Sequence, residues 1–189
     1  MTTDLLDLTS RAGLPDALRV LAKEFPREAW QAHANYSQLI DFWLNRHMMF
    51  RKLLTQLNTD AEAAVDRKLE AQAYKARVHR FGGMLINELH GHHQIEDAHY
   101  FPVMSGLDAR VASGFDILDS DHHLMDETLH ALATGANALL QAEGAGFHDK
   151  TGAFHHQLDA FGALLNRHLL DEEELVVPVL LKYAPEQFR

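Results

Sequence analysis

The stretch HHQIEDAHYFP, residues 92–102, decides the fold because a similar stretch recurs later in the chain. HLLDEEELVVP, residues 168–178, aligns with it at an offset of 76 residues. The alignment superimposes a His, a Glu four residues later and a Pro six residues after the Glu. At an offset of 75 residues, His47 pairs with His122 in a matching apolar context. The chain therefore reads as two similar halves, each with one lone His followed by one His-x-x-x-Glu.

Apolar residues at helical spacing fill four long stretches, and none shows the two-residue alternation of a half-buried strand. We therefore predict an all-α fold, an up-down-up-down four-helix bundle. The bundle is expected over residues 39–183, after a helical N-terminal extension, residues 1–38, and before a tail, residues 184–189. The four helices are expected at about residues 27–57, 61–97, 110–142 and 148–183.

The turns between the helices are indicated by local signals. EGAG, residues 143–146, has two glycines and should end the third helix. Two positions compete for the turn between the first two helices. NTDAE, residues 58–62, resembles a capping box, whereas arms of equal length on both sides of the turn would place it near Leu69.

Composition restricts the class of protein. The 189 residues include 27 acids against 17 Lys and Arg, a net charge of -10, which disfavours binding to nucleic acid. No apolar run is long enough to span a membrane, so we expect no membrane partner and a cytoplasmic location. Cysteine is absent, which excludes thiolate metal sites and cysteine nucleophiles. Histidine is unusually frequent, with 14 residues, and this excess requires a functional explanation.

The repeated spacing explains the histidines as metal ligands. Residues i and i+4 share a helix face, so each His-x-x-x-Glu can hold one ion, and the bundle brings the lone histidines to the same end. Nitrogen and oxygen donors suit iron, manganese or zinc. Six ligands exceed the needs of one ion, and closed zinc sites take four ligands, so we predict two iron ions, with manganese or zinc as alternatives. The predicted ligands are His47, His92, Glu96, His122, His168 and Glu172.

Neighbouring residues leave alternatives open. His123 competes with His122, but the apolar residues that follow His47 align with those after His122. Asp126 lies one helical turn after His122 and could complete the site. His93 has an acid four residues later and repeats the ligand geometry on a rotated face, so we assign it to a supporting or surface position.

A ferritin-like site is a further alternative. Glu96 with His99, and Glu127 with His130, have the Glu-x-x-His spacing of ferritin-like di-iron bundles. Such a site also needs lone inward glutamates on the other two helices, and the sequence offers none at a suitable repeat. The His-x-x-x-Glu interpretation is therefore preferred.

The pattern resembles the hemerythrin-like, or HHE cation-binding, family over about residues 39–181. The resemblance is carried by His47 and by HHQIEDAHYFP, DSDHHLMDE (residues 119–127) and RHLLDEEELVVP (residues 167–178). It implies a helical bundle with a non-haem di-iron centre. Oxygen carriers of the family have a second His where Asp126 stands, and their last acid would align with Glu173, although the Pro register favours Glu172. The chain thus resembles the variant branch associated with iron sensing, peroxide and nitric oxide rather than oxygen storage.

The resulting hypothesis is a non-haem di-iron protein that binds or processes oxygen, peroxide or nitric oxide. Its partner would be a small diatomic or peroxide ligand, with weak peroxide decomposition as a candidate activity. The alternative is an iron sensor or iron-storage module without turnover. No catalytic residue is assigned, and the sequence does not specify an oligomeric state.

Overall fold

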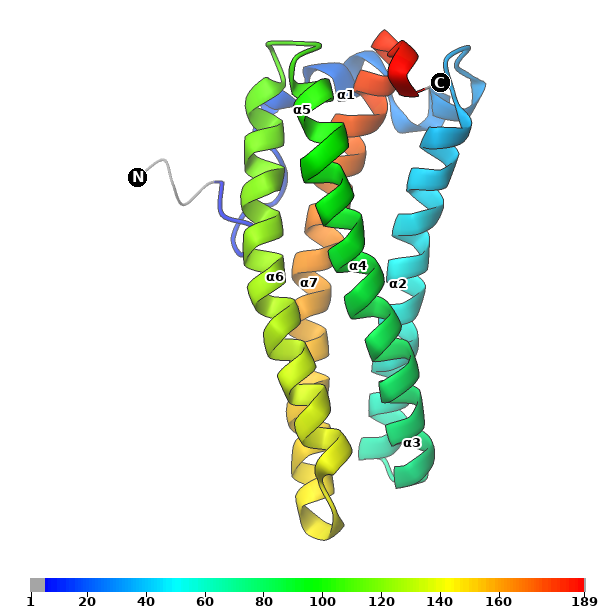
Figure 1. Cartoon of the computed structure of the whole chain (residues 1–189), viewed down its shortest axis with the longest axis vertical. Helices are drawn as coiled ribbons and strands as arrows, with labels where there is room; N and C mark the ends of the chain where they lie inside the picture. Colours follow the sequence, from blue (N-terminus) through cyan, green and yellow to red (C-terminus); the bar gives the residue numbers. More distant parts are fainter. Residues whose placement is uncertain (1–5, 189) are drawn as a thin grey trace. The chain divides into compact units, whose positions relative to one another are not determined.

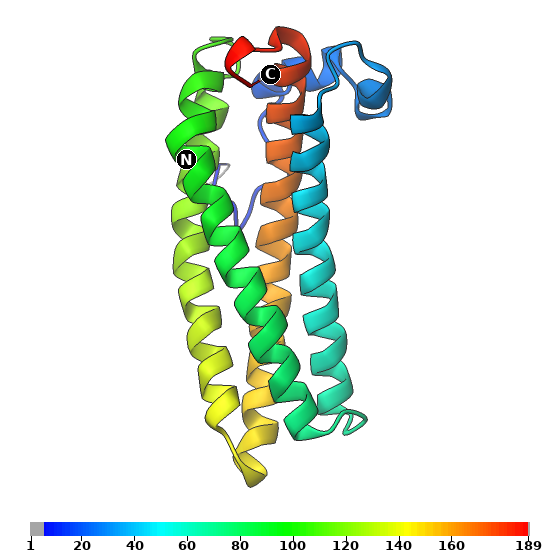
Figure 2. The same ribbon diagram turned by 45° about the vertical axis from the view of Figure 1, so that its right-hand side comes forward.

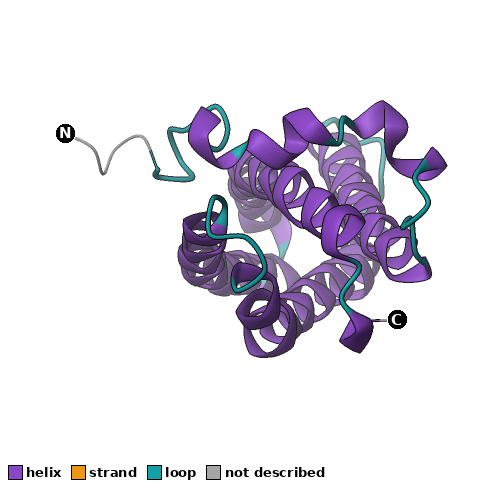
Figure 3. Ribbon diagram, turned by 90° about the horizontal axis from the view of Figure 1, so that it is seen from above, coloured by secondary structure: helices purple, strands orange, loops and turns teal. Residues whose placement is uncertain are grey.

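The computed structural model describes residues 6–188, and every regular element in that range is helical (Figure 3). This confirms the predicted all-α class. Residues 1–5 of the predicted extension and residue 189 of the predicted tail lie outside the described residues. Within residues 6–188, no helix combines the length and the apolar character needed to cross a membrane. The α-helices are α1 (Val20–Glu24), α2 (Gln38–Val65), α3 (Ala71–Arg77), α4 (Gly83–Ile95), α5 (Phe101–Ser105), α6 (Ala112–Gln141) and α7 (Gly144–Tyr183) (Figure 1).

Short 3-10 segments accompany the α-helices near the two ends of the chain, at Asp16–Leu18, Arg27–Ala32 and Glu186–Phe188. The first long helix was predicted to begin near Arg27, but α2 begins at Gln38. Pro26 precedes the 3-10 segment that starts at Arg27, so the proline begins a different helical element from the one expected.

The helical stretch from α3 to α5 contains two π-helical turns. Val78–Gly82 connects α3 to α4, and Glu96–Tyr100 connects α4 to α5. Such π turns are rare in proteins, and those that occur often lie at functional sites. The second π turn begins at Glu96, which is one of the predicted ligands. Pro102 lies in the first turn of α5, directly after the second π turn.

The turn between the first two long helices lies at residues 66–70, between α2 and α3. Arg67 has a positive φ of 59°, and the Lys68 N–H donates to the Ala63 carbonyl over 2.7 Å. Of the two competing positions, the turn at residues 58–62 is wrong, because these residues lie inside α2. The position near Leu69 is confirmed. Ala61 and Ala64 are buried, so tertiary packing continues the helix through the local capping signal. The end of the third helix predicted before EGAG is confirmed, since α6 ends at Gln141. The turn itself is only residues 142–143, because α7 already begins at Gly144 rather than near residue 148.

The chain divides into two compact units. Unit 1 consists of Met1–Met48, His93–His123 and Asn166–Arg189, and unit 2 consists of Met49–His92 and Leu124–Leu165. Helices α2, α4, α6 and α7 each contain residues of both units. The predicted metal ligands other than His92 belong to unit 1.

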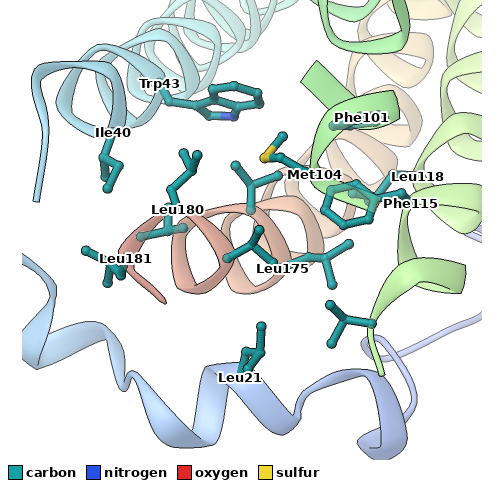
Figure 4. Packing of buried hydrophobic residues seen from close by; sticks show 14 of the residues in the cluster. Leu21, Ile40, Trp43, Phe101, Met104, Phe115, Leu118, Leu175, Leu180 and Leu181 are labelled. Carbon is teal, nitrogen blue, oxygen red and sulfur yellow. The ribbon is translucent and has the colours of Figure 1, made fainter. Parts of the chain in front are cut away.

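The core of unit 1 includes the N-terminal segment as well as the long helices. Trp43 of α2, Met104 of α5, Leu118 of α6 and Leu180 of α7 are buried in one cluster. Figure 4 shows Leu21 of α1 on another side of α7 from these residues. The N-terminal segment therefore buries apolar surface against the helices that carry the predicted ligands, which favours a fixed position for it.

Unit 2 is stabilised by close packing between its helices. His92 is the one predicted ligand among its residues. A Cβ atom at Gly162 of α7 would lie 2.9 Å from Leu54 Cδ2 of α2, so the glycine allows these helices to approach closely. Tyr74 of α3 packs edge-on against Phe147 of α7, with ring centroids 6.3 Å apart. This unit is a packed helical core with large buried aromatic side chains.

Candidate metal centre

Five of the predicted ligands lie together inside unit 1. They come from α2, the π turn at Glu96–Tyr100, α6 and α7, and each is at most 2% exposed: His47, Glu96, His122, His168 and Glu172. Long polar side chains with this degree of burial need specific partners in a protein interior. The repeated sequence pattern thus places its imidazoles and carboxylates in one buried cluster.

The imidazole Nε2 atoms face the two glutamates. His47 Nε2 lies 3.2 Å from Glu172 Oε1, and His168 Nε2 lies 3.3 Å from Glu172 Oε2. Across the same cluster, His122 Nε2 lies 3.6 Å from Glu96 Oε2 and 3.2 Å from His168 Nε2. The atoms suited to metal coordination therefore converge from several helices.

The other ring nitrogen, Nδ1, of each of these three imidazoles lies next to a carboxylate. His47 Nδ1 lies 3.0 Å from Glu173 Oε1, and His122 Nδ1 lies 2.7 Å from Asp97 Oδ1. His168 Nδ1 lies 3.2 Å from Asp121 Oδ2. A carboxylate that accepts an Nδ1–H fixes the ring and leaves the Nε2 lone pair for a metal. This carboxylate–histidine arrangement is typical of metal sites.

Side chains outside the predicted ligand set hold these carboxylates. Arg27 donates to Glu173 Oε2 over 2.6 Å, and Arg11 donates to both carboxylate oxygens of Asp121. The Trp43 indole N–H donates to Glu172 Oε1. These contacts could not be predicted from the sequence. A lone Arg or Trp has no spacing that marks it as the partner of a distant acid.

His93 packs against this cluster. The sequence predicts a supporting or surface position for it, and its burial in unit 1 excludes only the surface position. Its ring stacks on that of His122, with centroids 4.0 Å apart and an interplanar angle of 10°. One nitrogen each of His93, His122 and His168 lies within 4.8 Å of the others. The sequence signals for His93 are the His-His doublet at residues 92–93 and the acid four residues later, Asp97.

Three further predicted or alternative ligands remain: His92, His123 and Asp126. His92 is the last residue of its segment in unit 2, where its ring packs on Phe50 with centroids 5.3 Å apart. It precedes Glu96 by four residues, and its ligand role stays a prediction. His123 has a side chain that is 77% exposed, which favours His122 as the inward residue. Asp126 is exposed and lies 3.0 Å from His90 Nδ1.

The ferritin-like alternative receives no support from the described residues. His99 and His130 are both exposed, and neither belongs to a buried cluster of histidines and carboxylates. Their Glu-x-x-His spacing therefore does not bring imidazole nitrogens to a common inward point. Glu96 contacts the buried cluster, whereas Glu127 is exposed.

The electrostatics of the cluster suit a bound cation. Burial, together with the neighbouring Glu172, raises the pKa of Glu96 well above its usual range. Burial opposes protonation of His168, but hydrogen bonds to Asp121 and Glu172 raise its pKa to about 9. Two buried carboxylates beside each other repel, and a metal ion relieves that repulsion in place of protons. The nitrogen and oxygen donors fit iron, manganese or zinc.

Comparison with known proteins agrees with this geometry. The sequence model described as the Hemerythrin HHE cation binding domain matches residues 38–180. The matched range contains all the predicted ligands and most of the chain. Neither the curated proteins nor the solved structures gave a match.

Proposed function

The chain belongs to the hemerythrin HHE cation-binding family, and from this membership and the buried cluster we propose a di-iron protein that binds oxygen, peroxide or nitric oxide. The observation that carries the proposal is the pairing of each inward imidazole with an outer carboxylate. Three histidines each have Nδ1 within hydrogen-bond distance of a carboxylate, from Asp97, Asp121 or Glu173. Their Nε2 atoms lie near Glu96 or Glu172. Each outer carboxylate leaves the Nε2 atom of its histidine for a metal ion. Together with Glu96, Glu172 and the predicted ligand His92, these three histidines offer more donors than the four that a closed single-ion site takes.

The proposed ligands divide between two ions. Glu172 lies near His47 and His168, and Glu96 lies near His122. Both carboxylates would hold iron together with these imidazoles. His47 would serve one ion, and His122 and His168 the other. His92 stays the sixth ligand predicted from the repeat.

The side chains of the cluster would control what reaches the ions. A bound iron pair supplies redox chemistry and an open coordination position for a small ligand. Phe101 stacks on His122 with ring centroids 5.4 Å apart and keeps that side of the imidazole away from water. Trp43 orients Glu172 through its indole N–H. The chain's own contribution is thus to orient the donors and to exclude bulk solvent.

Metal analysis followed by reaction with hydrogen peroxide tests this proposal. The full chain, produced without a His-tag, would be analysed for bound metals and then mixed with hydrogen peroxide in a stopped-flow instrument. We expect two iron ions per chain and a change in absorption on mixing. A preparation that holds no metal and cannot be loaded with iron, manganese or zinc would contradict the proposal.

An iron sensor or iron store is the second candidate function. It is favoured by one observation: Arg11 and Arg27 of the N-terminal segment contact carboxylates that hold the proposed ligands. Metal occupancy would then stabilise that segment, because binding energy and folding are coupled. Metal-dependent ordering without peroxide turnover would favour the sensor, and oxygen evolution from peroxide would favour the reactive centre. Either role fits the cytoplasmic location expected from the sequence.

A further inference from the structure

Arg11 is a buried cation that holds two acids of different helices. Its guanidinium donates to both oxygens of Asp121 in α6, and its Nε donates to Asp171 Oδ2 in α7 over 2.8 Å. The Arg11 side chain is 1% exposed, and those of the two acids are 4% and 0% exposed. Because a buried charge is costly unless it is fully paired, this geometry must be well determined in the folded protein.

The two acids have different second partners. Asp121 Oδ2 also lies 3.2 Å from Nδ1 of His168, so Arg11, Asp121 and His168 form a continuous chain of contacts. The other nitrogen of His168, Nε2, lies 3.3 Å from Glu172. Arg11 therefore stands three contacts from Glu172, although it lies more than 150 residues earlier in the sequence.

The backbone around Arg11 is fixed by separate hydrogen bonds. The Leu14 N–H donates to Asp171 Oδ1 over 3.1 Å, and Arg167 donates to the Ala12 carbonyl over 2.7 Å. Figures 1 and 2 show this N-terminal segment, in dark blue, beside α6 and α7. Arg11 is thus delivered to Asp121 by a segment that is itself attached to α7.

We propose that Arg11 is a positioning residue for the metal ligand His168, acting through Asp121. This inference rests on the proposed metal function. A bidentate guanidinium fixes the plane of a carboxylate, and the carboxylate then fixes the imidazole ring that it accepts a hydrogen bond from. The N-terminal segment, which the sequence presents as an extension of the bundle, becomes a structural part of the metal centre.

The proposal also implies coupling in the reverse direction. If docking of Arg11 strengthens metal binding, metal binding must strengthen the docking of the segment by the same factor. Cleavage of residues 6–19 by a protease should therefore slow when iron is added to the wild-type chain. It should slow less in a variant that lacks the Arg11 side chain's guanidinium.

Anaerobic titration of the full-length, metal-free chain with iron(II) tests the role of Arg11. We expect R11Q to weaken the affinity for the ion held by His168 roughly 10-fold, within the range known for outer partners of metal ligands. R11K should recover part of the loss, because Lys keeps the charge but lacks the fork. R19Q is the matched control, since Arg19 lies in the same segment and pairs with Glu174 of α7 over 2.9 Å. Circular dichroism verifies that each variant is folded.

A double-mutant cycle tests the route through Asp121. The combined variant R11Q/D121N should bind iron no more weakly than the poorer of the two single variants. Wild-type affinity in R11Q, an equal loss in R19Q, or full additivity with D121N would overturn the role of Arg11. If R11Q does not fold, the same comparisons made with R11K decide the question, with a wild-type affinity again overturning it. Failure of the wild-type chain to bind iron would instead overturn the proposed function.

Discussion

Trp43 donates its indole N–H to Glu172 Oε1, the same oxygen that lies 3.2 Å from His47 Nε2. One carboxylate oxygen therefore receives both a fixed donor and a predicted metal-binding imidazole. Because Trp43 is buried in the unit 1 core, its ring position is set by packing rather than by the cluster. The apolar core thus determines how Glu172 is oriented.

Replacing Trp43 by Phe should weaken metal binding while keeping the fold. W43F retains an aromatic ring but loses the N–H that orients Glu172, so we expect about a 10-fold loss in iron affinity. Iron(II) titration with the absorption spectrum of the oxidised protein measures the effect. W30F is the control, because the Trp30 indole donates to the Phe25 carbonyl and not to the cluster. Unchanged affinity in W43F would show that packing alone orients Glu172.

Glu96→Gln should separate the stability of the fold from metal binding. In the metal-free protein, burial and Glu172 make a charged Glu96 unfavourable, and a neutral amide of the same shape removes this burden. We expect the melting temperature of metal-free E96Q to rise by about 2–4 °C for each 1 kcal/mol gained. Iron binding should fall sharply, because the amide carries no negative charge. Calorimetry with and without iron gives both quantities, and a lower melting temperature for metal-free E96Q would contradict the argument.

His93→Gln should remove part of the bound metal. One ring nitrogen of His93 lies within 4.8 Å of one ring nitrogen of His122 and of His168. His93 would therefore complete a group of three imidazoles around the ion that His122 and His168 hold. We expect H93Q to retain less than two iron ions per chain in elemental analysis. H99Q, at an exposed position of the same helical stretch, should retain the wild-type amount. Equal metal content in both variants would limit His93 to packing against His122.

Much of the fold and the candidate cluster could be predicted because both follow from helical periodicity. His47 and His168 lie at repeated positions of apolar helix faces, and both are fully buried. The turn at residues 66–70 could not be predicted from its own sequence. The local signal at residues 58–62 competes with burial of the α2 face, and the energy of packing exceeds that of a cap.

The outer partners of the cluster could not be predicted for a different reason. Arg11 lies outside the repeated halves, and its contacts with Asp121 and Asp171 depend on the path of an irregular segment. Periodicity places residues on the face of one helix, but it does not state where a non-periodic segment crosses that face. Glu173 was named only as an alternative ligand. The structure instead places one of its oxygens on His47 Nδ1 and the other near Arg27.

Acid should weaken unit 1 through Asp108, which precedes α6. Hydrogen bonds from Arg110 and from the Tyr183 hydroxyl hold the pKa of Asp108 well below its ordinary value of 3.8. Because the pKa of Asp108 is lower in the folded state, the unfolded chain binds the proton more readily. The stability that the charged Asp108 contributes is therefore complete above pH 3.8 and is lost as the pH falls toward the folded-state pKa. D108N should therefore melt at a lower temperature than the wild type at pH 7, and the difference should narrow below about pH 4. Melting of the metal-free proteins between pH 7 and pH 3 measures this. D16N is the control, because Asp16 is exposed and pairs with the exposed Lys23 at 3.3 Å. A gap between D108N and wild type that stays constant with pH would mean that Asp108 stabilises the loop by shape rather than by charge.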